Sequence, residues 1–222
     1  MNSFSFVSLV LVFIKGVTYT FVSLFSIVNP IGGSAIFLSV TKPFSSEDKK
    51  MLAIKVFKYG AILLTATYCF GSFLLGVFGV SMFALQIAGG LVIFSSAWSL
   101  LSSKENNSDI DINNQNPKSM AFFPLTMPLT AGAGAISVVI ALSADNASVD
   151  NIPSVFVAGA GAIVGIWCLM LLTGICYNFS EKIFGILGKN GVIIVTRLTA
   201  FILISIGVGM VCGGIKTFVG TF

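Results

Sequence analysis

Long apolar runs separated by short polar stretches are the dominant pattern of this chain. Most runs contain about 20 residues or more, which is the length that an α-helix needs to cross a bilayer. The pattern predicts six membrane-spanning helices, over residues 16–41, 58–78, 83–101, 120–142, 153–179 and 195–219. The apolar residues 4–14 either extend the first helix outward or lie at the membrane interface, with the Lys15 ammonium group reaching the headgroups.

The composition supports a membrane protein and excludes several other classes. Hydrophobic residues make up 56% of the 222 positions and charged residues 9%, whereas about 25% of the residues of an average soluble domain are charged. Six spans use more than half of the chain, so we expect one membrane domain over residues 1–222 that lies in a lipid bilayer. The net charge of +4 comes from residues between the apolar runs, where membrane topology accounts for it. Nucleic acid is therefore not expected as a partner.

The basic residues gather on one set of loops and give the expected orientation. Ten of the twelve lysines and arginines lie in the first, third and fifth loops or at the adjacent start of the sixth span, and Lys15 and Lys216 lie on the opposite side. Positive charge is retained on the cytoplasmic side of membrane proteins. The odd-numbered loops should therefore face the cytoplasm, and both termini should be extracytoplasmic.

A polar, asparagine-rich stretch divides the chain into two halves of three spans each. Residues 102–119 are low in complexity and are predicted to form a flexible cytoplasmic linker. Because each half has an odd number of spans, the second half must enter the membrane inverted relative to the first. The expected fold is thus all-α, with two inverted three-helix repeats over about 16–101 and 120–219.

Proline and glycine interrupt two of the apolar runs near their middle. The interruptions read Asn-Pro-Ile-Gly-Gly-Ser over residues 29–34 and Met-Pro-Leu-Thr-Ala-Gly-Ala-Gly over residues 127–134. Pro30 and Pro128 each remove a backbone donor and clash with the preceding turn. Freed backbone groups are tolerated at membrane depth only where they line a cavity or are buried in protein. We therefore expect discontinuous first and fourth helices, with Ser34 capping the second half of the first helix.

Interruptions at corresponding places in two inverted halves predict a transport site. The second half-helices would direct two N-termini, with their free N–H groups and positive dipole ends, into one pocket suited to a carboxylate. Small residues leave room there, and freed carbonyl groups can accept hydrogen bonds from an ammonium group, so the expected ligand is a small zwitterion. The candidate binding residues are Asn29, Gly32, Gly33, Ser34, Thr126, Thr130, Gly132 and Gly134. The alternative is that both clusters are simple kinks or close-packing points.

The residues that enzymes and metal sites need are missing from the predicted spans. The chain has no histidine, and all eight acidic residues fall in predicted loops or at span ends. We therefore expect no catalytic residues, no enzyme activity, no metal site and no cofactor. A coupling cation, held by carbonyl and hydroxyl groups, is left open. The glycine pair Gly89-Gly90 is predicted to pack helices closely, and Gly207, Gly209, Gly213 and Gly214 of the sixth span repeat that pattern, with Gly209 and Gly213 as a GxxxG motif. The alternative is that these glycines form a wall against which the broken helices slide.

Several motifs resemble those of the MarC family of bacterial and archaeal membrane proteins. They are Asn-Pro-Ile-Gly-Gly at 29–33, Gln-Ile-Ala-Gly-Gly at 86–90, the segment 121–132 and Arg197-Leu198. The resemblance implies a six-helix, multi-pass protein of the plasma membrane, which in bacteria is the inner membrane. The family includes transporters of small neutral amino acids such as glycine and alanine. Seven residues match its two signature breaks, namely Asn29, Pro30, Gly32, Pro128, Thr130, Gly132 and Gly134.

The leading hypothesis is a secondary transporter of small neutral amino acids that works by alternating access. One inverted repeat would rock against the other around the central pocket. Two alternatives remain: an exporter or channel for other small solutes, and a non-transporting membrane factor. The direction of transport and the presence of a homo-oligomer are left open.

Overall fold

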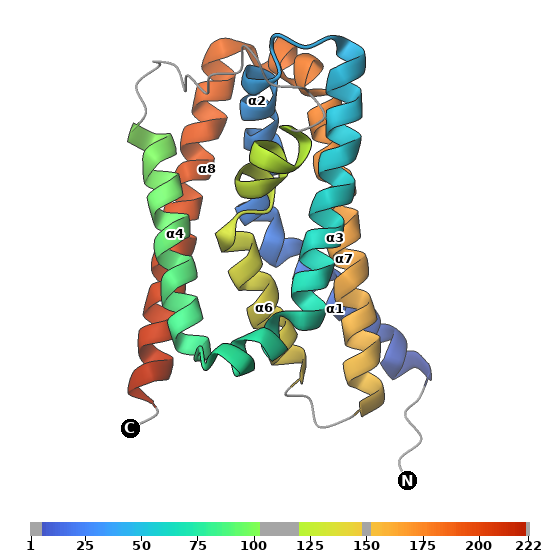
Figure 1. The fold of residues 1–222 in the computed structure, drawn as a ribbon, viewed down its shortest axis with the longest axis vertical. Coiled ribbons are helices and arrows are strands. Elements are labelled where there is room, and N and C mark those ends of the chain that lie inside the picture. The colour runs from blue at the N-terminus through green and yellow to red at the C-terminus, as the bar shows by residue number, and fades with distance from the viewer. Residues whose placement is uncertain (1–5, 103–119, 148–151, 221–222) are drawn as a thin grey trace.

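A computed structural model describes residues 6–102, 120–147 and 152–220, which form a bundle of helices (Figure 1). The helices are α1 (Phe6–Val28), α2 (Pro30–Val40), α3 (Ser46–Phe78), α4 (Met82–Ser102), η1 (Ala121–Thr130), α6 (Ala133–Ala147), α7 (Ile152–Asn178) and α8 (Ser180–Val219). The described residues contain no strand, which confirms the all-α prediction. Among the described residues, five helices are long and apolar enough to cross a membrane, and six if the bent pair of η1 and α6 counts as one span. The predicted linker at 102–119 lies almost entirely outside the described residues.

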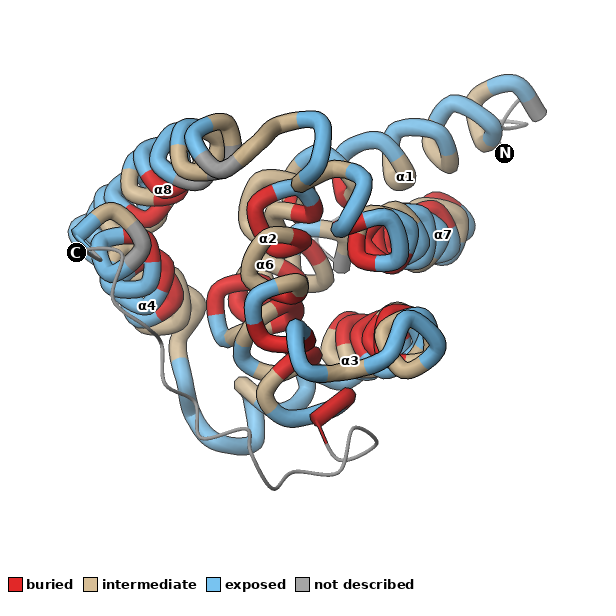
Figure 2. The backbone as a smooth tube through the Cα atoms, turned by 90° about the horizontal axis from the view of Figure 1, so that it is seen from above, coloured by how far each residue is buried: buried red, intermediate tan, exposed pale blue. Residues whose placement is uncertain are grey.

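The helices form two groups with a central layer between them (Figures 1 and 2). Helices α4 and α8 pack along each other on one side, and α1, α3 and α7 pack together on the other. Helices α2 and α6 and the segment η1 lie between these groups. The α2–α3 and α7–α8 connections lie at one end of the bundle, and the start of α1 and the end of α8 lie at the other (Figure 1).

Buried apolar side chains hold the central layer against the group of α1, α3 and α7. One cluster includes Leu24, Leu64 and Ile166, and a second includes Phe37 and Leu52. The outward faces are also apolar, because many large hydrophobic side chains stay exposed on the outside of the bundle. Burying apolar residues inside while exposing others all round is the pattern of a protein whose surroundings are lipid.

Helix α3 begins twelve residues earlier than the predicted start at residue 58. Ser45 caps it, since the Ser45 hydroxyl accepts a hydrogen bond from the backbone N–H of Asp48 at 3.1 Å. Glu47 and Asp48 in the first turn also interact favourably with the positive end of the helix. The sequence predicts a loop here because these polar residues show no apolar periodicity. The lysines between 49 and 58 therefore lie on the first turns of a helix.

Two other boundaries refine the predicted spans. Helix α1 begins at Phe6, so the residues before 16 extend the first helix. Helix α8 begins at Ser180, although its span was predicted to start at 195. Its backbone is interrupted at Gly188, where φ is 63° and ψ is 174°, a conformation that favours glycine. The fifth loop is thus a helical turn or two followed by a break, rather than an extended connection.

Glycines allow α4 and α8 to approach closely. A Cβ atom on Gly90 would lie 2.6 Å from the carbonyl oxygen of Gly207, and one on Gly207 would lie 2.7 Å from that of Gly90. The packing role predicted for the pair at 89–90 is confirmed. In the sixth span the prediction is confirmed for Gly207 and for Gly214, where a Cβ atom would lie 2.7 Å from the side chain of Ile87. It is wrong for Gly209 and Gly213, because a Cβ atom on either would meet nothing within 4 Å. A GxxxG spacing sets both glycines on one face of a helix but does not determine which face a neighbour covers.

Candidate functional site

The first interruption is centred on Asn29, between α1 and α2. Asn29 has φ 48° and ψ 67°, the left-handed conformation that asparagine tolerates better than most residues. Its side-chain Oδ1 accepts a hydrogen bond from the N–H of Gly32 at 3.0 Å. Pro30 follows at the first position of α2, where its missing N–H leaves no bond unmade. Asn29 and Pro30 together therefore end one helix and start the next.

The predicted capping role of Ser34 is wrong. Ser34 lies within α2 and is buried, and its hydroxyl donates a hydrogen bond to the carbonyl of Ile31 at 2.6 Å. The cap lies five residues earlier because proline is tolerated in the first turn of a helix, so α2 can begin at Pro30 itself. Gly32 is required next to this cap, since a Cβ atom there would overlap the side-chain amide of Asn29.

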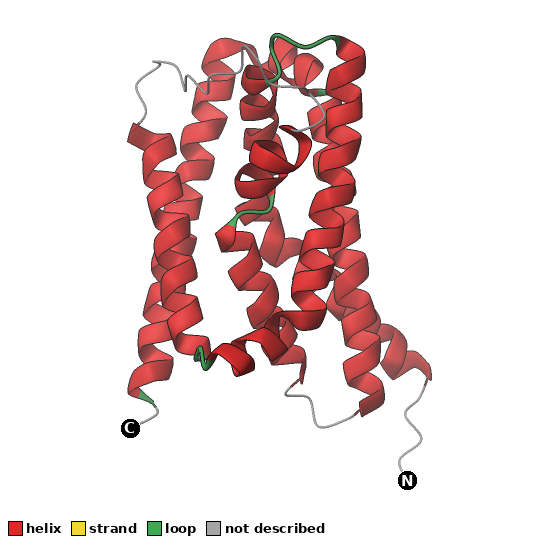
Figure 3. Ribbon diagram, in the orientation of Figure 1, coloured by secondary structure: helices red, strands yellow, loops and turns green. Residues whose placement is uncertain are grey.

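The second interruption spans η1 and its connection to α6, which Figure 3 shows as a short loop near mid-height of the bundle. Phe123 and Met127 have extended backbone conformations, as residues before proline prefer, and both bonds to the following prolines are cis. The hydroxyl groups of Thr126 and Thr130 donate to the carbonyl oxygens of Ala121 and Leu125, each at 2.7 Å. A tandem Pro-Leu-Thr unit at 124–126 and 128–130 thus satisfies part of its own irregular backbone. The axes of η1 and α6 meet at 65°.

Both interruptions border one cavity of about 410 Å³. It lies between the central layer and the pair formed by α4 and α8. The candidate residues that line it are Asn29, Gly33, Pro128, Thr130, Gly132 and Gly134. Its remaining walls are mostly apolar, and none of the described residues that line it is charged. A ligand in this cavity would therefore be held by neutral dipoles and hydrogen-bonding groups.

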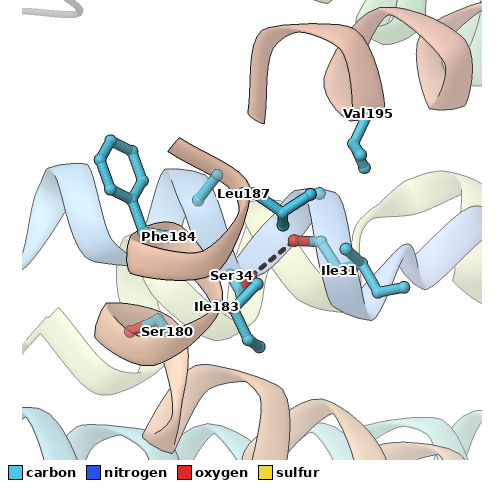
Figure 4. A pocket seen from close by; sticks show the side chains of 9 residues that line it. Ile31, Ser34, Ser180, Ile183, Phe184, Leu187 and Val195 are labelled. Carbon is cyan, nitrogen blue, oxygen red and sulfur yellow. Dashed lines mark hydrogen bonds between the residues drawn. The ribbon is translucent and has the colours of Figure 1, made fainter. Parts of the chain in front are cut away.

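Other candidate residues lie outside this cavity. Gly32 and Ser34 border a separate hollow between α2 and the first turns of α8, which Figure 4 shows together with Ile183 and Leu187. That hollow has room for only about 10 Å³, less than a small solute needs. Thr126 is buried within η1, and Pro30 is buried at the start of α2.

The two helix starts differ in the backbone donors that they offer. In α6 the N–H of Ile136 bonds to the carbonyl of Gly132 at 3.1 Å. The N–H groups of residues 133–135 precede that bond and have no acceptor within the helix, and all three residues line the cavity. In α2 the N–H of Gly32 is capped, and that of Gly33 bonds to the carbonyl of Asn29 at 2.8 Å. The start of α6 is therefore the better anion site, and α2 adds chiefly the Asn29 amide.

Tyr177, which no sequence pattern indicated, contacts two residues that line the cavity, Gly33 and Thr130. The hydroxyl groups of Tyr177 and Thr130 lie 2.9 Å apart, and both residues are buried. Thr130 gives its only proton to Leu125, so Tyr177 must be the donor in this pair. The Tyr177 ring stacks on Phe37 with centroids 4.7 Å apart. A Cβ atom on Gly33 would lie 2.7 Å from the Tyr177 hydroxyl, so Gly33 allows the ring to reach η1.

Tyr177 therefore connects α7 to both interruptions. It contacts α2 through Phe37 and Gly33, and η1 through Thr130. With its proton already donated, the Thr130 hydroxyl can only accept a further hydrogen bond. Nothing in the sequence indicates this contact, because Thr130 and Tyr177 are 47 positions apart and Tyr177 lies in an ordinary apolar span.

Comparison with known proteins places the chain in a family. Residues 14–219 match the family described as MarC family integral membrane protein. The chain is 31% identical to the UPF0056 membrane protein YvbG of Bacillus subtilis over 205 residues, covering 90% of this chain and 94% of the relative. It is 34% identical to a UPF0056 membrane protein of Buchnera aphidicola, covering 88% and 90%. It is also 33% identical to one of Pyrococcus horikoshii, covering 91% and 96%.

No solved structure matches the chain. The family match covers both interruptions, all the residues that line the cavity and Tyr177. The chain therefore belongs to the MarC family of integral membrane proteins.

Proposed function

We propose that the protein is a secondary transporter of small neutral amino acids, of the size of glycine or alanine, that works by alternating access across the plasma membrane. One observation carries the proposal: two interrupted helices border a single cavity of about 410 Å³ whose described lining is uncharged. A cavity of this size has room for a small amino acid and several waters, each of which occupies about 30 Å³ in the liquid. Without acids, bases or activated nucleophiles in that lining, we assign no catalytic role.

The packing of the helices supports two inverted repeats. The first repeat would contain α1 with α2, then α3 and α4, and the second would contain η1 with α6, then α7 and α8. Helix α3 packs on α7 and α4 packs on α8, so each pairs with its counterpart. Helices α1 and α2 pack on α7 while η1 and α6 pack on α3, and α2 packs on α8 while α6 packs on α4. Exchanging the two halves turns each of these contacts into another of them, as a pseudo-two-fold axis requires, whereas the small contacts α1–α8, α6–α7 and α7–α8 have no equally extensive counterpart.

The donors and acceptors of the cavity suit the two ends of a zwitterion. The carboxylate would bind the N–H groups at the start of α6, where the helix dipole favours negative charge. The Asn29 side chain adds a donor. Its Oδ1 accepts a hydrogen bond from the N–H of Gly32, and its Nδ2 is left to donate to the ligand. The ammonium group would donate to the Thr130 hydroxyl and to carbonyl groups of η1. The apolar wall then favours a ligand with an uncharged side chain.

Alternating access would come from rocking of the α4–α8 pair, which takes one helix from each repeat, against the rest of the bundle. Rocking of one whole repeat against the other is less suited to this packing, because the extensive α4–α8 interface joins the two repeats. The pair contacts the other helices mainly through α6 and α2, whereas its own interface is extensive. The cavity lies at this seam, since Ile93 and Ser96 of α4 and Leu203 of α8 form one wall. Both termini would be extracytoplasmic, because most of the lysines belong to the end of the bundle opposite to them.

Flux measurements in proteoliposomes test this proposal. The purified protein should exchange labelled alanine or glycine with saturable kinetics. For alanine and its larger analogues, the exchange should also be stereoselective. Ala133→Leu should abolish exchange, because Ala133 lines the cavity and is exposed, so a leucine there would occupy part of the cavity. Ala66→Leu is the matched control, since Ala66 is exposed on α3 away from the cavity. Unsaturable flux would indicate a channel, and full activity in Ala133→Leu would remove the cavity from the transport path.

A further inference from the structure

A second groove lies on the outer surface of the bundle between α3 and α7, which run side by side (Figure 2). It has room for about 240 Å³. The groove exists because small residues form its floor. Ala53 is fully buried there, and a Cβ atom on Gly174 would lie 3.0 Å from the Cβ of Phe57. A larger residue at either position would fill the space between the two helices.

The sides of the groove are apolar and open to the surroundings. Ile54, Leu171 and Ile175 line it, and their side chains are 45%, 51% and 45% exposed. In a protein that spans a membrane, such side chains face lipid rather than water. An apolar slot between two parallel walls on the lipid-facing surface matches the shape of an acyl chain.

One end of the groove is polar and basic. Lys50 and Asn178 line it there, where α3 begins and α7 ends. The neighbouring Lys49 is occupied, because its ammonium group lies 2.7 Å from a carboxylate oxygen of Glu181. Lys50 is exposed and has no ionic or hydrogen-bonding partner within the described parts of the chain. The groove therefore combines an apolar slot with an available cation and an amide at the end of the bundle where most of the lysines lie.

We propose that this groove binds an anionic phospholipid. One acyl chain would occupy the slot between α3 and α7, and the phosphate would bind the Lys50 ammonium group and the Asn178 side-chain amide. Long lysine side chains extend along apolar surfaces to reach the headgroup region. The cytoplasmic leaflet, which this end is expected to face, is the one rich in anionic lipid. The assignment does not depend on what the central cavity transports.

Trp167 provides a native reporter for this groove. Its ring packs edge-on against Phe57, which lines the groove, with centroids 5.8 Å apart. Eleven residues separate Trp167 from Asn178, a rise of about 16 Å along α7, which places the indole near the middle of a bound acyl chain. The other tryptophan, Trp98, lies on α4 at a distance from this face. Trp98→Phe therefore gives a protein whose tryptophan fluorescence reports on the groove alone.

The experiment compares quenching of Trp167 by two lipids brominated at mid-chain, phosphatidylglycerol and phosphatidylcholine, at equal mole fraction in nanodiscs. Phosphatidylglycerol should quench more strongly, with an apparent preference of roughly fivefold, which is the effect of one lysine near an anionic surface. Lys50→Gln should make the two lipids equivalent. Lys58→Gln should not, because Lys58 is an exposed lysine of the same helix that does not line the groove.

Two outcomes would overturn the proposal. The first is equal quenching of Trp167 by both lipids in the Trp98→Phe protein. The second is the same loss of preference in Lys50→Gln and Lys58→Gln, which would indicate a general charge effect. Trp167→Phe, which leaves Trp98 as the reporter, should show no preference between the lipids. A preference there equal to that at Trp167 would also contradict a specific groove.

Discussion

The contact between Tyr177 and Thr130 gives a prediction whose sign as well as its size follows from the structure. Thr130→Val removes the hydroxyl that bonds to Leu125 and accepts from Tyr177. It leaves the Tyr177 hydroxyl buried without a partner, and such a group costs about 1–3 kcal/mol. Loss of the hydrogen bond from the Thr130 hydroxyl to the Leu125 carbonyl adds about 1 kcal/mol. We therefore expect Thr130→Val to lower the free energy of unfolding by about 2–4 kcal/mol.

Adding Tyr177→Phe to this variant should restore stability. The second substitution removes the unpaired hydroxyl but keeps the ring, so the stack on Phe37 remains. The double variant should be more stable than Thr130→Val by about 1–3 kcal/mol. Tyr177→Phe alone should lower stability by about 1 kcal/mol, because it removes one hydrogen bond and leaves Thr130 bonded to Leu125.

Unfolding in mixed micelles, followed by circular dichroism as the denaturing detergent fraction rises, measures these differences. Tyr59→Phe is the matched control, since Tyr59 is exposed on α3 and forms no hydrogen bond with the described residues. It should leave stability unchanged. If the effects of Thr130→Val and Tyr177→Phe simply added, with no rescue in the double variant, the two hydroxyl groups would not be paired in the folded protein.

Three further predictions concern the helix start, the glycine interface and the uncharged cavity. Asn29→Ala should lower the free energy of unfolding by about 1 kcal/mol through loss of the cap, whereas Asn29→Gly should lower it by only a few tenths of a kcal/mol. Equal losses for the two variants in the same unfolding assay would argue against capping. Gly207→Ala should destabilise the protein by about 1–3 kcal/mol, because its Cβ would meet the carbonyl of Gly90. Gly209→Ala should be neutral or slightly stabilising. The thermal midpoints of the two variants should therefore differ, and equal midpoints would contradict close packing of α4 and α8 at Gly207. The affinity for alanine, measured by equilibrium dialysis in detergent, should stay constant between about pH 5 and pH 8, because no described cavity residue titrates there; a tenfold change would require an ionisable group at the site.

The sequence was sufficient to predict the helices because long apolar runs have few alternatives in a membrane. It was insufficient at helix ends, where single side chains decide the boundary. Ser45 starts α3 within a stretch that has no apolar period, and Gly188 interrupts α8 inside a predicted loop. At the first interruption the Asn-Pro pair carried the correct signal, because asparagine caps helices and proline suits their first position. Ser34 also belongs to a residue type that caps helices, but α2 already begins at Pro30, so Ser34 lies within the helix.

The candidate site could be predicted only in part, since a cavity depends on which faces meet. The prolines and glycines at 29–34 and 127–134 indicated two interruptions, and residues from both line one cavity. Spacing could not show that Gly32 and Ser34 face α8 instead, or that Tyr177 reaches between α2 and η1. Those contacts join residues far apart in the sequence, and they depend on packing that no local pattern encodes.

Protection of a cavity thiol by a small amino acid shows whether the ligand binds between the two interrupted helices. With the four native cysteines replaced by alanine, the rate of alkylation is measured in Ala133→Cys and in the control Lys42→Cys, with and without alanine or glycine. Lys42 is exposed in the α2–α3 connection and does not line the cavity. We expect either amino acid to slow alkylation in Ala133→Cys, because the ligand would occupy the cavity at the start of α6, and to leave the rate in Lys42→Cys unchanged. An alkylation rate in Ala133→Cys that no small amino acid alters would contradict a binding site between the two interrupted helices.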